Sequence, residues 1–443
     1  MYTESRHIIE TPNMRFDATP DAPIEDQPVI GIIGMGEMGK MYAKVLSAAG
    51  WAKCSRINVL RDGHRVSRTA DWVMYAVEAQ FMDKVVAEYG PSTKVGSIVG
   101  GQTSVKTPEK EAFEKYLPED VHIISCHSLH GPTVSPEGQP LVIIRHRGPD
   151  WALKLVENIL RPFRSHFVYL SYEDHDLVTA NTQAVTHAAF LSMGTAWHCS
   201  QSYPWEQGLY VRGIEIVKVN IMLRIYSNQW HVYAGLAILN PAARGMIKQY
   251  SASTTELFKL MLAGDIKGLR ERVYKAREAL FGPHRRVTPI LLSEDVLDKF
   301  GMSCVEADGS PTKSTGNNAL PGTISRELLG SVNIDPFEHL SLAATPLFRM
   351  WIGVAEYLFR SEERLDAALS AAVHNVSHRS DDLEFVVAAR GWSQCVTFGS
   401  FELYKDRFQH TQSFFQPRFA EATAIGSKMI KTILDNAPPT PSE

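Results

Sequence analysis

Short apolar runs alternate with longer amphipathic stretches through the first third of the chain, as strands alternate with helices. The runs predicted to be strands are residues 29–33, 72–77, 95–99, 121–125, 141–144 and 167–170. Apolar runs of this length, separated by helix-length segments, are typical of a largely parallel sheet covered on both faces. We therefore predict an α/β domain at residues 28–171, preceded by a polar, flexible tail at residues 1–27.

Beyond about Tyr172 the strand pattern ends and helical periodicity replaces it. The predicted helices are residues 174–198, 220–239, 252–281, 346–372, 381–401 and 403–436. Residues 282–335 are richer in Pro, Gly and Ser, so we predict a loop-rich segment there. The second domain, residues 172–443, is therefore expected to be all-α.

Composition and charge exclude several classes of protein. The 443 residues carry a net charge of −4, which gives no basic excess for a nucleic-acid partner. No apolar run approaches the ~20 residues that cross a bilayer, and the N-terminus lacks the order of a secretory signal. The five cysteines are widely spread without a CxxC pair, which favours a cytoplasmic location and argues against disulfides or zinc.

A glycine-rich turn follows the first predicted strand and precedes an amphipathic helix. Its residues are Gly34, Met35, Gly36, Glu37, Met38 and Gly39. In such a GxGxxG turn, Gly34 permits the tight bend, Gly36 lets the backbone approach a pyrophosphate, and Gly39 lets helix and strand pack closely. The helix N-terminus offers free N–H groups to the phosphates, so we predict a dinucleotide-binding site.

The reader of the adenosine ribose is expected about 20 residues past this turn. Asp62 is a candidate for a ribose hydroxyl, and Arg56 or Arg61 for a 2′-phosphate. None of them is well placed by spacing. The residues alone therefore leave NAD and NADP open.

Several stretches resemble prephenate dehydrogenase, most closely its fungal NADP-dependent form. They are GIIGMGEMG at 31–39, VGGQTS at 99–104, HSLHGP at 127–132, TQAVTHAAF at 182–190 and TPLFR at 345–349. The resemblance implies a Rossmann-type domain followed by a helical dimerisation domain, and a homodimer. It also implies oxidative decarboxylation of prephenate to 4-hydroxyphenylpyruvate in tyrosine biosynthesis, with NADP as cofactor and NAD as the alternative.

One segment departs from that family. The fungal enzymes carry a longer stretch after the equivalent of Trp51, with the second strand of the domain and its helix. Here roughly 15–20 residues are missing, about one strand–helix step. We expect this shortening to weaken discrimination between NAD and NADP, and to expose a sheet edge near residues 72–77.

Two residues are predicted to be catalytic. His127 follows the strand 121–125 at the carboxyl edge of the sheet, where ligands of such folds bind. A histidine suits a proton acceptor, and the resemblance places the family's catalytic histidine here. The resemblance also implies that Ser104 bridges this histidine and the nicotinamide or substrate hydroxyl. The alternative for Ser104 is a helix N-cap.

Further residues are assigned to the ligands. Gln183 and His187 lie four apart on one predicted helix face with small neighbours, which suits a substrate site, although a solvated stripe is the alternative. The resemblance assigns Arg349 to a substrate carboxylate, with Arg224 as runner-up and an interhelical salt bridge as the alternative role for Arg349. His130 is assigned to the substrate, since a two-histidine metal site would lack a nearby carboxylate. The residues assigned to the cofactor beyond the glycine turn are Val77, Glu78 and Gln102.

Two other functions stay open. A β-hydroxyacid dehydrogenase of the 6-phosphogluconate type also opens with such a glycine turn. It would need a catalytic lysine on the interdomain helix, and residues 174–198 contain none. A homologue that binds a nucleotide without turnover is the second alternative, because of the shortened segment.

Overall fold

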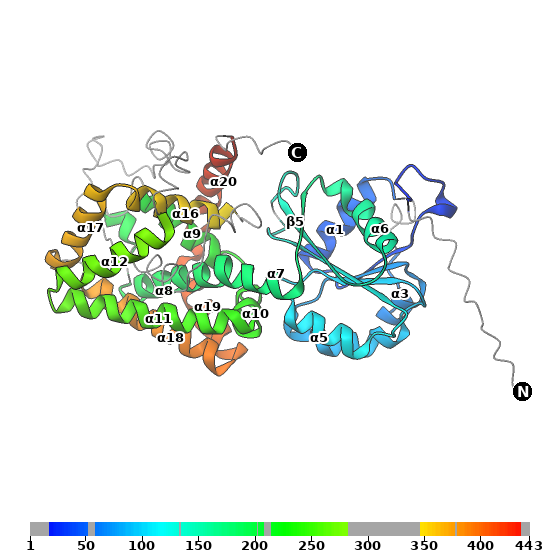
Figure 1. Ribbon diagram of the computed structural model, residues 1–443, viewed down its shortest axis with the longest axis horizontal. Coiled ribbons are helices and arrows are strands. Elements are labelled where there is room, and N and C mark those ends of the chain that lie inside the picture. Colours follow the sequence, from blue (N-terminus) through cyan, green and yellow to red (C-terminus); the bar gives the residue numbers. More distant parts are fainter. Residues whose placement is uncertain are drawn as a thin grey trace, which may run out of the picture. The chain divides into compact units, whose positions relative to one another are not determined.

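The computed structural model describes residues 17–51, 58–132, 134–201, 203–207, 214–281, 346–376 and 379–435. The chain forms two compact units, Met1–Asp176 and Leu177–Glu443, which are described separately (Figure 1). None of the described helices combines the length and the apolar character that a membrane span requires.

The first unit contains a six-stranded sheet. Its strands are β1 (Ile30–Ile33), β2 (Trp72–Tyr75), β3 (Ile98–Gly101), β4 (His122–Ser128), β5 (Pro140–Arg147) and β6 (His166–Tyr169). They lie side by side in chain order, and every neighbouring pair is parallel except β4 and β5. All six predicted strands are present, and the predicted α/β fold of the Rossmann type is confirmed.

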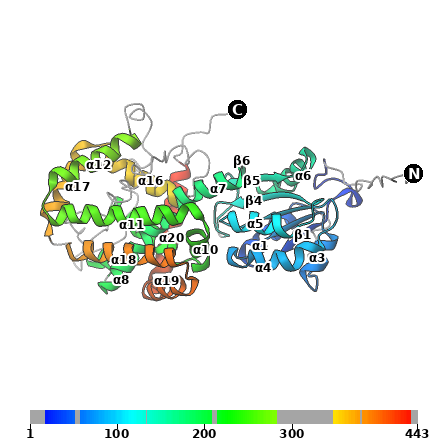
Figure 2. The same ribbon diagram turned by 60° about the horizontal axis from the view of Figure 1, so that its bottom comes forward.

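Helices cover both faces of this sheet, as predicted (Figures 1 and 2). They are α1 (Glu37–Ala48) and α6 (Asp150–Leu160) on one face, and α3 (Gly63–Thr69), α4 (Met82–Tyr89) and α5 (Thr107–Tyr116) on the other. Successive side chains of a strand point to opposite faces. Trp72 and Met74 of β2 therefore pack with α1 and α6, and Val73 and Tyr75 pack with α4 and α5.

The free edge of the sheet is not where we predicted it. β2 is paired on both sides, with β1 and β3, so an exposed edge near residues 72–77 is wrong. Within the described residues, the strands with a neighbour on one side only are β1 and β6. The chain after the shortened segment enters β2, beside β1, and residues 52–57 lie outside the described part of the chain.

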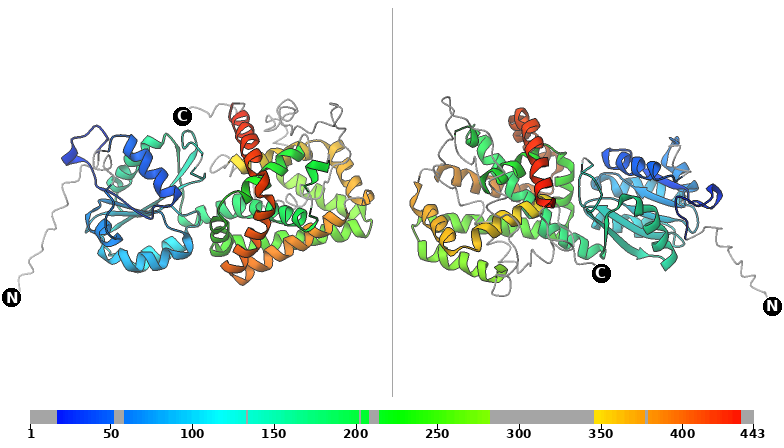
Figure 3. Two further views of the ribbon diagram at one scale, coloured as in Figure 1. Left: turned by 180° about the vertical axis from the view of Figure 1, so that it is seen from behind. Right: turned by 90° about the horizontal axis from the view of Figure 1, so that it is seen from above.

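The second unit is helical throughout its described residues, and Figure 3 shows α20 in red from two sides. Its elements after α7 (Tyr172–Thr179) are a π-helical segment (Ala180–Ala184), α8 (Val185–Cys199), α9 (Ile214–Tyr226), α10 (Trp230–Leu239), α11 (Pro241–Leu262), α12 (Ile266–Phe281), α16 (Pro346–Phe359), α17 (Glu362–His374), α18 (Arg379–Phe398), α19 (Phe401–Phe415) and α20 (Phe419–Asp435). The loop-rich segment predicted at 282–335 lies outside the described residues.

Several predicted helices are in fact pairs of helices. The prediction of one helix over 252–281 is wrong because Gly264 has a φ of +68° and ends α11. The predicted helix 220–239 is likewise divided into α9 and α10. Asn240 then begins α11 by accepting hydrogen bonds from the N–H groups of Ala242 and Ala243.

Candidate active site

The glycine turn has the geometry that its sequence predicts. Gly34 has a φ of +104°, and a β-carbon there would collide with the carbonyl oxygen of Ala76. A β-carbon at Gly39 would collide with the carbonyl oxygen of Gly34, so helix α1 passes directly over the turn. A β-carbon at Gly36 would meet nothing within 4 Å, and Gly36 is the N-cap of α1. The structural roles of Gly34 and Gly39 are confirmed, and an open side remains at Gly36.

The other residues of the turn differ in exposure. Met35 and Glu37 are exposed, and Met38 is partly buried against the sheet. Glu37 accepts a hydrogen bond from Lys40 at 3.0 Å, one turn further along α1. The side chains of Met35 and Glu37 thus leave the N-terminus of the helix open to solvent.

The remaining predicted cofactor residues follow β2 and β3. Val77 lies against the glycine turn, about where a side chain at Gly34 would be. Glu78 accepts a hydrogen bond from Gln80 at 2.7 Å. The N–H of Gln102 donates to the carbonyl of Tyr75 at 3.0 Å, which continues the β2–β3 pairing past the strand. These residues line the carboxyl ends of the strands next to β1.

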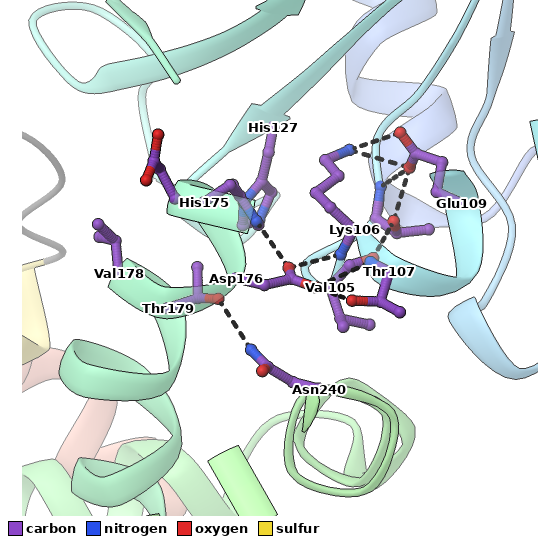
Figure 4. A network of polar contacts seen from close by, with 12 residues as sticks. Val105, Lys106, Thr107, Glu109, His127, His175, Asp176, Val178, Thr179 and Asn240 are labelled. Atoms are coloured by element: carbon purple, nitrogen blue, oxygen red, sulfur yellow. Dashed lines mark hydrogen bonds and ion pairs between the residues drawn. The ribbon is translucent and has the colours of Figure 1, made fainter. Parts of the chain in front are cut away.

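His127 is buried near the end of β4. The strand extends to Ser128, beyond the predicted limit at 125, so His127 belongs to the strand instead of following it. Its Nδ1 lies 2.8 Å from Nε2 of His175 in α7. Nδ1 of His175 in turn lies 3.0 Å from Oδ1 of Asp176 (Figure 4). Sequence reasoning identified His127 but missed His175 and Asp176.

The carboxylate of Asp176 holds the beginning of α5. Its Oδ1 accepts the backbone N–H of Lys106 at 2.7 Å. Its Oδ2 accepts the N–H of Thr107 at 2.8 Å and the Thr107 hydroxyl at 2.7 Å. An anion is favourable at this position because the first N–H groups of a helix have no partner within the helix.

The N-cap alternative for Ser104 is therefore wrong. The carboxylate of Asp176, distant in sequence, supplies what a local cap would supply. Ser104 lies in the loop between β3 and α5, partly exposed, and its hydroxyl forms no hydrogen bond to another described residue. The hydroxyl is thus free for the bridging role that the resemblance implies, which stays a prediction.

A buried cation joins the ends of β3 and β4. Pairing between these strands stops before β3 ends. Beyond that point the Lys106 ammonium donates to the carbonyl of Gly101 at 3.0 Å and to that of Cys126 at 2.9 Å. It also donates to both carboxylate oxygens of Glu109, at 2.9 and 3.0 Å. Lys106 and Glu109 have fully buried side chains, so this ion pair fixes the residue that precedes His127.

Burial sets the charges in this network. It holds the pKa of His127 well below its usual value, with further lowering by His175 and the Lys106 ammonium. Burial also lowers the pKa of His175, against the hydrogen bond to Asp176, which raises it. Burial would raise the pKa of Asp176, but the hydrogen bonds from His175, Thr107 and Lys106 outweigh it and the pKa is lowered. Near neutral pH both histidines are therefore neutral and Asp176 is ionised.

Helix α1 is tied to the same strand. The hydroxyl of Tyr42 lies 2.6 Å from Oγ of Ser128, the residue after His127, and both groups are buried. The helix that begins at the glycine turn is thereby joined to the end of β4.

His130 lies just beyond β4. Its Nδ1 is 2.9 Å from the carbonyl of Gly131, and its Nε2 is buried without a partner among the described residues. Burial lowers its pKa. In the described part of the chain, no three His, Cys, Asp or Glu side chains are grouped as a metal site requires.

Gln183 and His187 lie in the second unit, and the structure separates their roles. Gln183 is in the π-helical segment, which alters the four-residue spacing that predicted a shared face. His187 lines a small pocket with Ala184, Ala188 and Tyr233, and Gln183 does not. The His187 and Tyr233 rings meet edge to face with centroids 4.6 Å apart.

His187 does not belong to a solvated stripe. Its Nδ1 is buried and has no partner among the described residues. Burial lowers its pKa to about 3, so the ring is neutral. The pocket therefore presents an uncharged polar atom in apolar and aromatic surroundings.

The two candidate arginines also lie in the second unit. Arg349 is in α16, which begins at Pro346 as predicted, and its side chain is outside the described set. Arg224 in α9 is partly buried, and its Nε has no partner among the described residues. Burial lowers the pKa of Arg224. The guanidinium forms no ion pair with any described residue, which leaves its charge available.

Comparisons with known proteins cover nearly the whole chain. Residues 184–435 match a family model described as a "6-phosphogluconate dehydrogenase C-terminal domain". The chain is 50% identical over 426 residues to "Probable prephenate dehydrogenase [NADP(+)]" of Schizosaccharomyces pombe, covering 92% of this chain and 98% of that protein. It is 48% identical over 431 residues to "Prephenate dehydrogenase [NADP(+)]" of Saccharomyces cerevisiae, covering 92% and 94%.

Among solved structures, the prephenate dehydrogenase of A. aeolicus in complex with hydroxyphenyl propionate and NAD+ is 19% identical to this chain. The match covers 55% of this chain and 93% of that chain, with a TM-score of 0.43.

Proposed function

The chain belongs to the family of fungal prephenate dehydrogenases, and we propose that it converts prephenate to 4-hydroxyphenylpyruvate in tyrosine biosynthesis, using NADP. The observation that carries this proposal is the near-complete match to two NADP-dependent relatives. The structure supports it with a neutral, buried histidine at the carboxyl edge of a sheet that begins with a dinucleotide-type glycine turn.

The reaction requires a base at the ring hydroxyl. As the C–OH carbon is oxidised, the hydroxyl proton leaves to a base and the oxygen becomes a carbonyl. Loss of CO2 then makes the ring aromatic, and the same oxygen takes a proton to become the phenol. We assign the base to His127, because its ring is held neutral and can take the proton and later return it. Ser104, with its uncommitted hydroxyl, is assigned to orient the reacting groups.

The cofactor residues are proposed from the glycine turn. NADP, when bound, supplies the nicotinamide that receives the hydride. The open side of Gly36 and the free N–H groups of α1 suit the pyrophosphate. Val77, Glu78 and Gln102 complete the proposed site along the strand ends. NAD is the alternative cofactor, since Asp62, one candidate ribose reader, is occupied as the N-cap of α3.

Prephenate carries two carboxylates, so its site needs cations. For the second unit we propose Arg349, with Arg224 as the alternative because its charge has no ion pair among the described residues. Gln183 and His187 of the same unit, and His130 of the first, are proposed as further substrate-binding residues.

We also propose a cytoplasmic homodimer. The helical unit is larger than the sheet-containing one, and long helices such as α11 and α18 offer extended faces for a two-fold contact. Light scattering at micromolar concentration should give twice the 49.4 kDa chain mass, and a monomer mass would contradict the dimer.

The direct test is a steady-state assay of the pure protein with prephenate or arogenate, each against NADP and NAD. We expect NADPH formation with prephenate. Folded protein that binds NADP without forming NADPH from either substrate would favour the non-catalytic alternative. Turnover of a β-hydroxy acid instead would favour the 6-phosphogluconate type.

A further inference from the structure

We propose that His175 and Asp176 are positioning residues that hold His127 in the single tautomer able to accept the substrate proton. The inference rests on the proposed function for its chemical consequence. Its structural content, the position of each ring proton, follows from the contacts of three side chains in the first unit (Figure 4).

The deduction begins at Asp176, because an ionised carboxylate only accepts hydrogen bonds. Nδ1 of His175, 3.0 Å from Oδ1 of Asp176, must therefore carry a hydrogen. A neutral imidazole has only one N–H, so Nε2 of His175 is an acceptor. Nδ1 of His127, 2.8 Å from that acceptor, must then be the donor. Nε2 of His127 is left with its lone pair, which is the form that a general base requires.

Asp176 is held as an acceptor by groups that cannot reverse their direction. The backbone N–H groups of Lys106 and Thr107 point at its two oxygens, and neither can become an acceptor. Protonating Asp176 would weaken both contacts at the N-terminus of α5. The helix start thus fixes the first link, and the two rings pass the constraint on to His127.

Burial removes the competing arrangement. The side chains of His175 and Asp176 are only 1% and 6% exposed, and His127 is 5% exposed. Bulk water is therefore not at hand to satisfy a ring nitrogen that points the wrong way. In the opposite tautomer, unprotonated nitrogens of the two rings or of a ring and the carboxylate would face each other, at the cost of an unpaired buried group.

The same carboxylate also fixes the loop that carries Ser104. That loop ends at Lys106, whose N–H is held by Asp176 and whose ammonium holds the carbonyl before His127. One residue thereby sets both the proton position on the base and the place where the neighbouring loop joins α5.

The experiment compares His175→Gln with His175→Leu. The two polar atoms of a glutamine amide are spaced much like the two ring nitrogens, so Gln can donate to Asp176 and accept from His127. Leu can do neither. We expect His175→Leu to lower kcat about 100-fold with the KM for prephenate changed less than about threefold, since a correctly positioned base contributes ~10²–10⁴-fold. His175→Gln should stay within about tenfold of the parent kcat.

The matched control is His166→Leu, on the exposed side of β6, which should keep the parent kcat. Thermal unfolding of each variant shows whether it is folded. A purely packing role predicts that Leu is tolerated at least as well as Gln at position 175, and that result would overturn the proposal.

A second measurement does not depend on turnover. In protein with ring-15N histidine, nitrogen chemical shifts distinguish protonated from unprotonated ring nitrogens. The 16 histidines are assigned by difference with His127→Asn and His175→Gln. We expect His127 with a protonated Nδ1 and an unprotonated Nε2 at neutral pH. The reverse assignment would sink the inference even in an active enzyme, and the expected one would support it even if prephenate proved not to be the substrate.

Discussion

His127 and His187 are both buried at a ring nitrogen and both neutral, yet their surroundings differ. Nδ1 of His127 belongs to a chain of hydrogen bonds that continues to Asp176 and the start of α5. Nδ1 of His187 has no partner among the described residues and faces a pocket of alanine and aromatic side chains. The first unit thus fixes the state of its histidine in advance, whereas the second leaves a polar atom unsatisfied.

An unsatisfied buried polar atom costs stability, and a satisfied one restricts motion. The comparison therefore teaches that the two units contribute differently. The sheet-containing unit supplies preorganised chemistry, and the helical unit retains groups, His187 and Arg224, whose hydrogen-bonding capacity is unused by the described residues. Four experiments break or sharpen this difference.

The largest effect is expected for His127→Asn. Removing a positioned base should lower kcat by about 10²–10⁴-fold, with a smaller change in KM, because substrate carboxylate contacts remain. The matched change in the other unit is His187→Asn, which should raise KM more than it lowers kcat. Near-native turnover by His127→Asn would show that another group, with His130 tested next, is the base.

Lys106→Met tests the cost of breaking the satisfied network. It leaves the Glu109 carboxylate buried without its cation, which should lower the free energy of unfolding by about 3–5 kcal/mol. Urea unfolding measures the change, and Lys106→Met/Glu109→Gln should recover part of it.

The control for that experiment is Lys110→Met. Lys110 pairs with Glu173 at 2.7 Å, but the pair is solvent-accessible, so the loss should be about 0–1 kcal/mol. Equal losses for the buried and the exposed lysine would show that the buried pair does not organise the ends of β3 and β4.

Acid should destabilise the protein through its buried neutral histidines. The folded pKa of His187, about 3, lies below the ordinary value of 6.5, so the unfolded chain binds a proton that the folded chain does not. Its contribution is fully present above about pH 6.5 and is lost as the pH falls towards 3, amounting to about 1–2 kcal/mol at pH 5. His127 and His175 shift in the same direction, with Lys106, Glu109, Asp176 and His130 as the charged or titratable groups around them. Urea unfolding between pH 8 and pH 5 should show the loss, and His187→Leu should flatten it.

The smallest effect is the stability of His187→Leu at neutral pH. Replacing an unsatisfied nitrogen with an apolar group should leave the free energy of unfolding unchanged or raise it by about 1 kcal/mol. His175→Leu, which deprives Asp176 and His127 of a partner, should instead lower it by about 1–3 kcal/mol. Destabilisation of the same size at both positions would erase the distinction between the two histidines.

The sequence was sufficient to predict the sheet but only part of the network. Strands of the first unit are continuous apolar runs because both faces are buried, so all six were recognisable. The helix divisions were less accessible, since Gly264 and Asn240 resemble tolerated interior residues until their backbone angles and cap contacts are known. Local sequence also suggested Ser104 as the cap of α5, because nothing nearby reveals that a carboxylate comes from α7.

His175 and Asp176 were missed for the same reason. They form a His-Asp pair at the beginning of a predicted helix, and polar residues are ordinary there. Their distinguishing property is burial, which depends on where α7 meets the ends of β3 and β4. The three-residue spacing of Lys106 and Glu109 was a visible signal, but the same spacing is common on exposed helices.

The order of the strands has a consequence for how the protein is made. Each described strand pairs with the strand synthesised just before it, so the sheet can grow by one neighbour at a time as the chain leaves the ribosome. No described strand has to wait for a distant segment to close the gap beside it. His175 and Asp176 come after β6, so the hydrogen bonds that set His127 are made only once the last strand is in place. The chemistry of the site is thus assembled last, as a seal on a finished sheet.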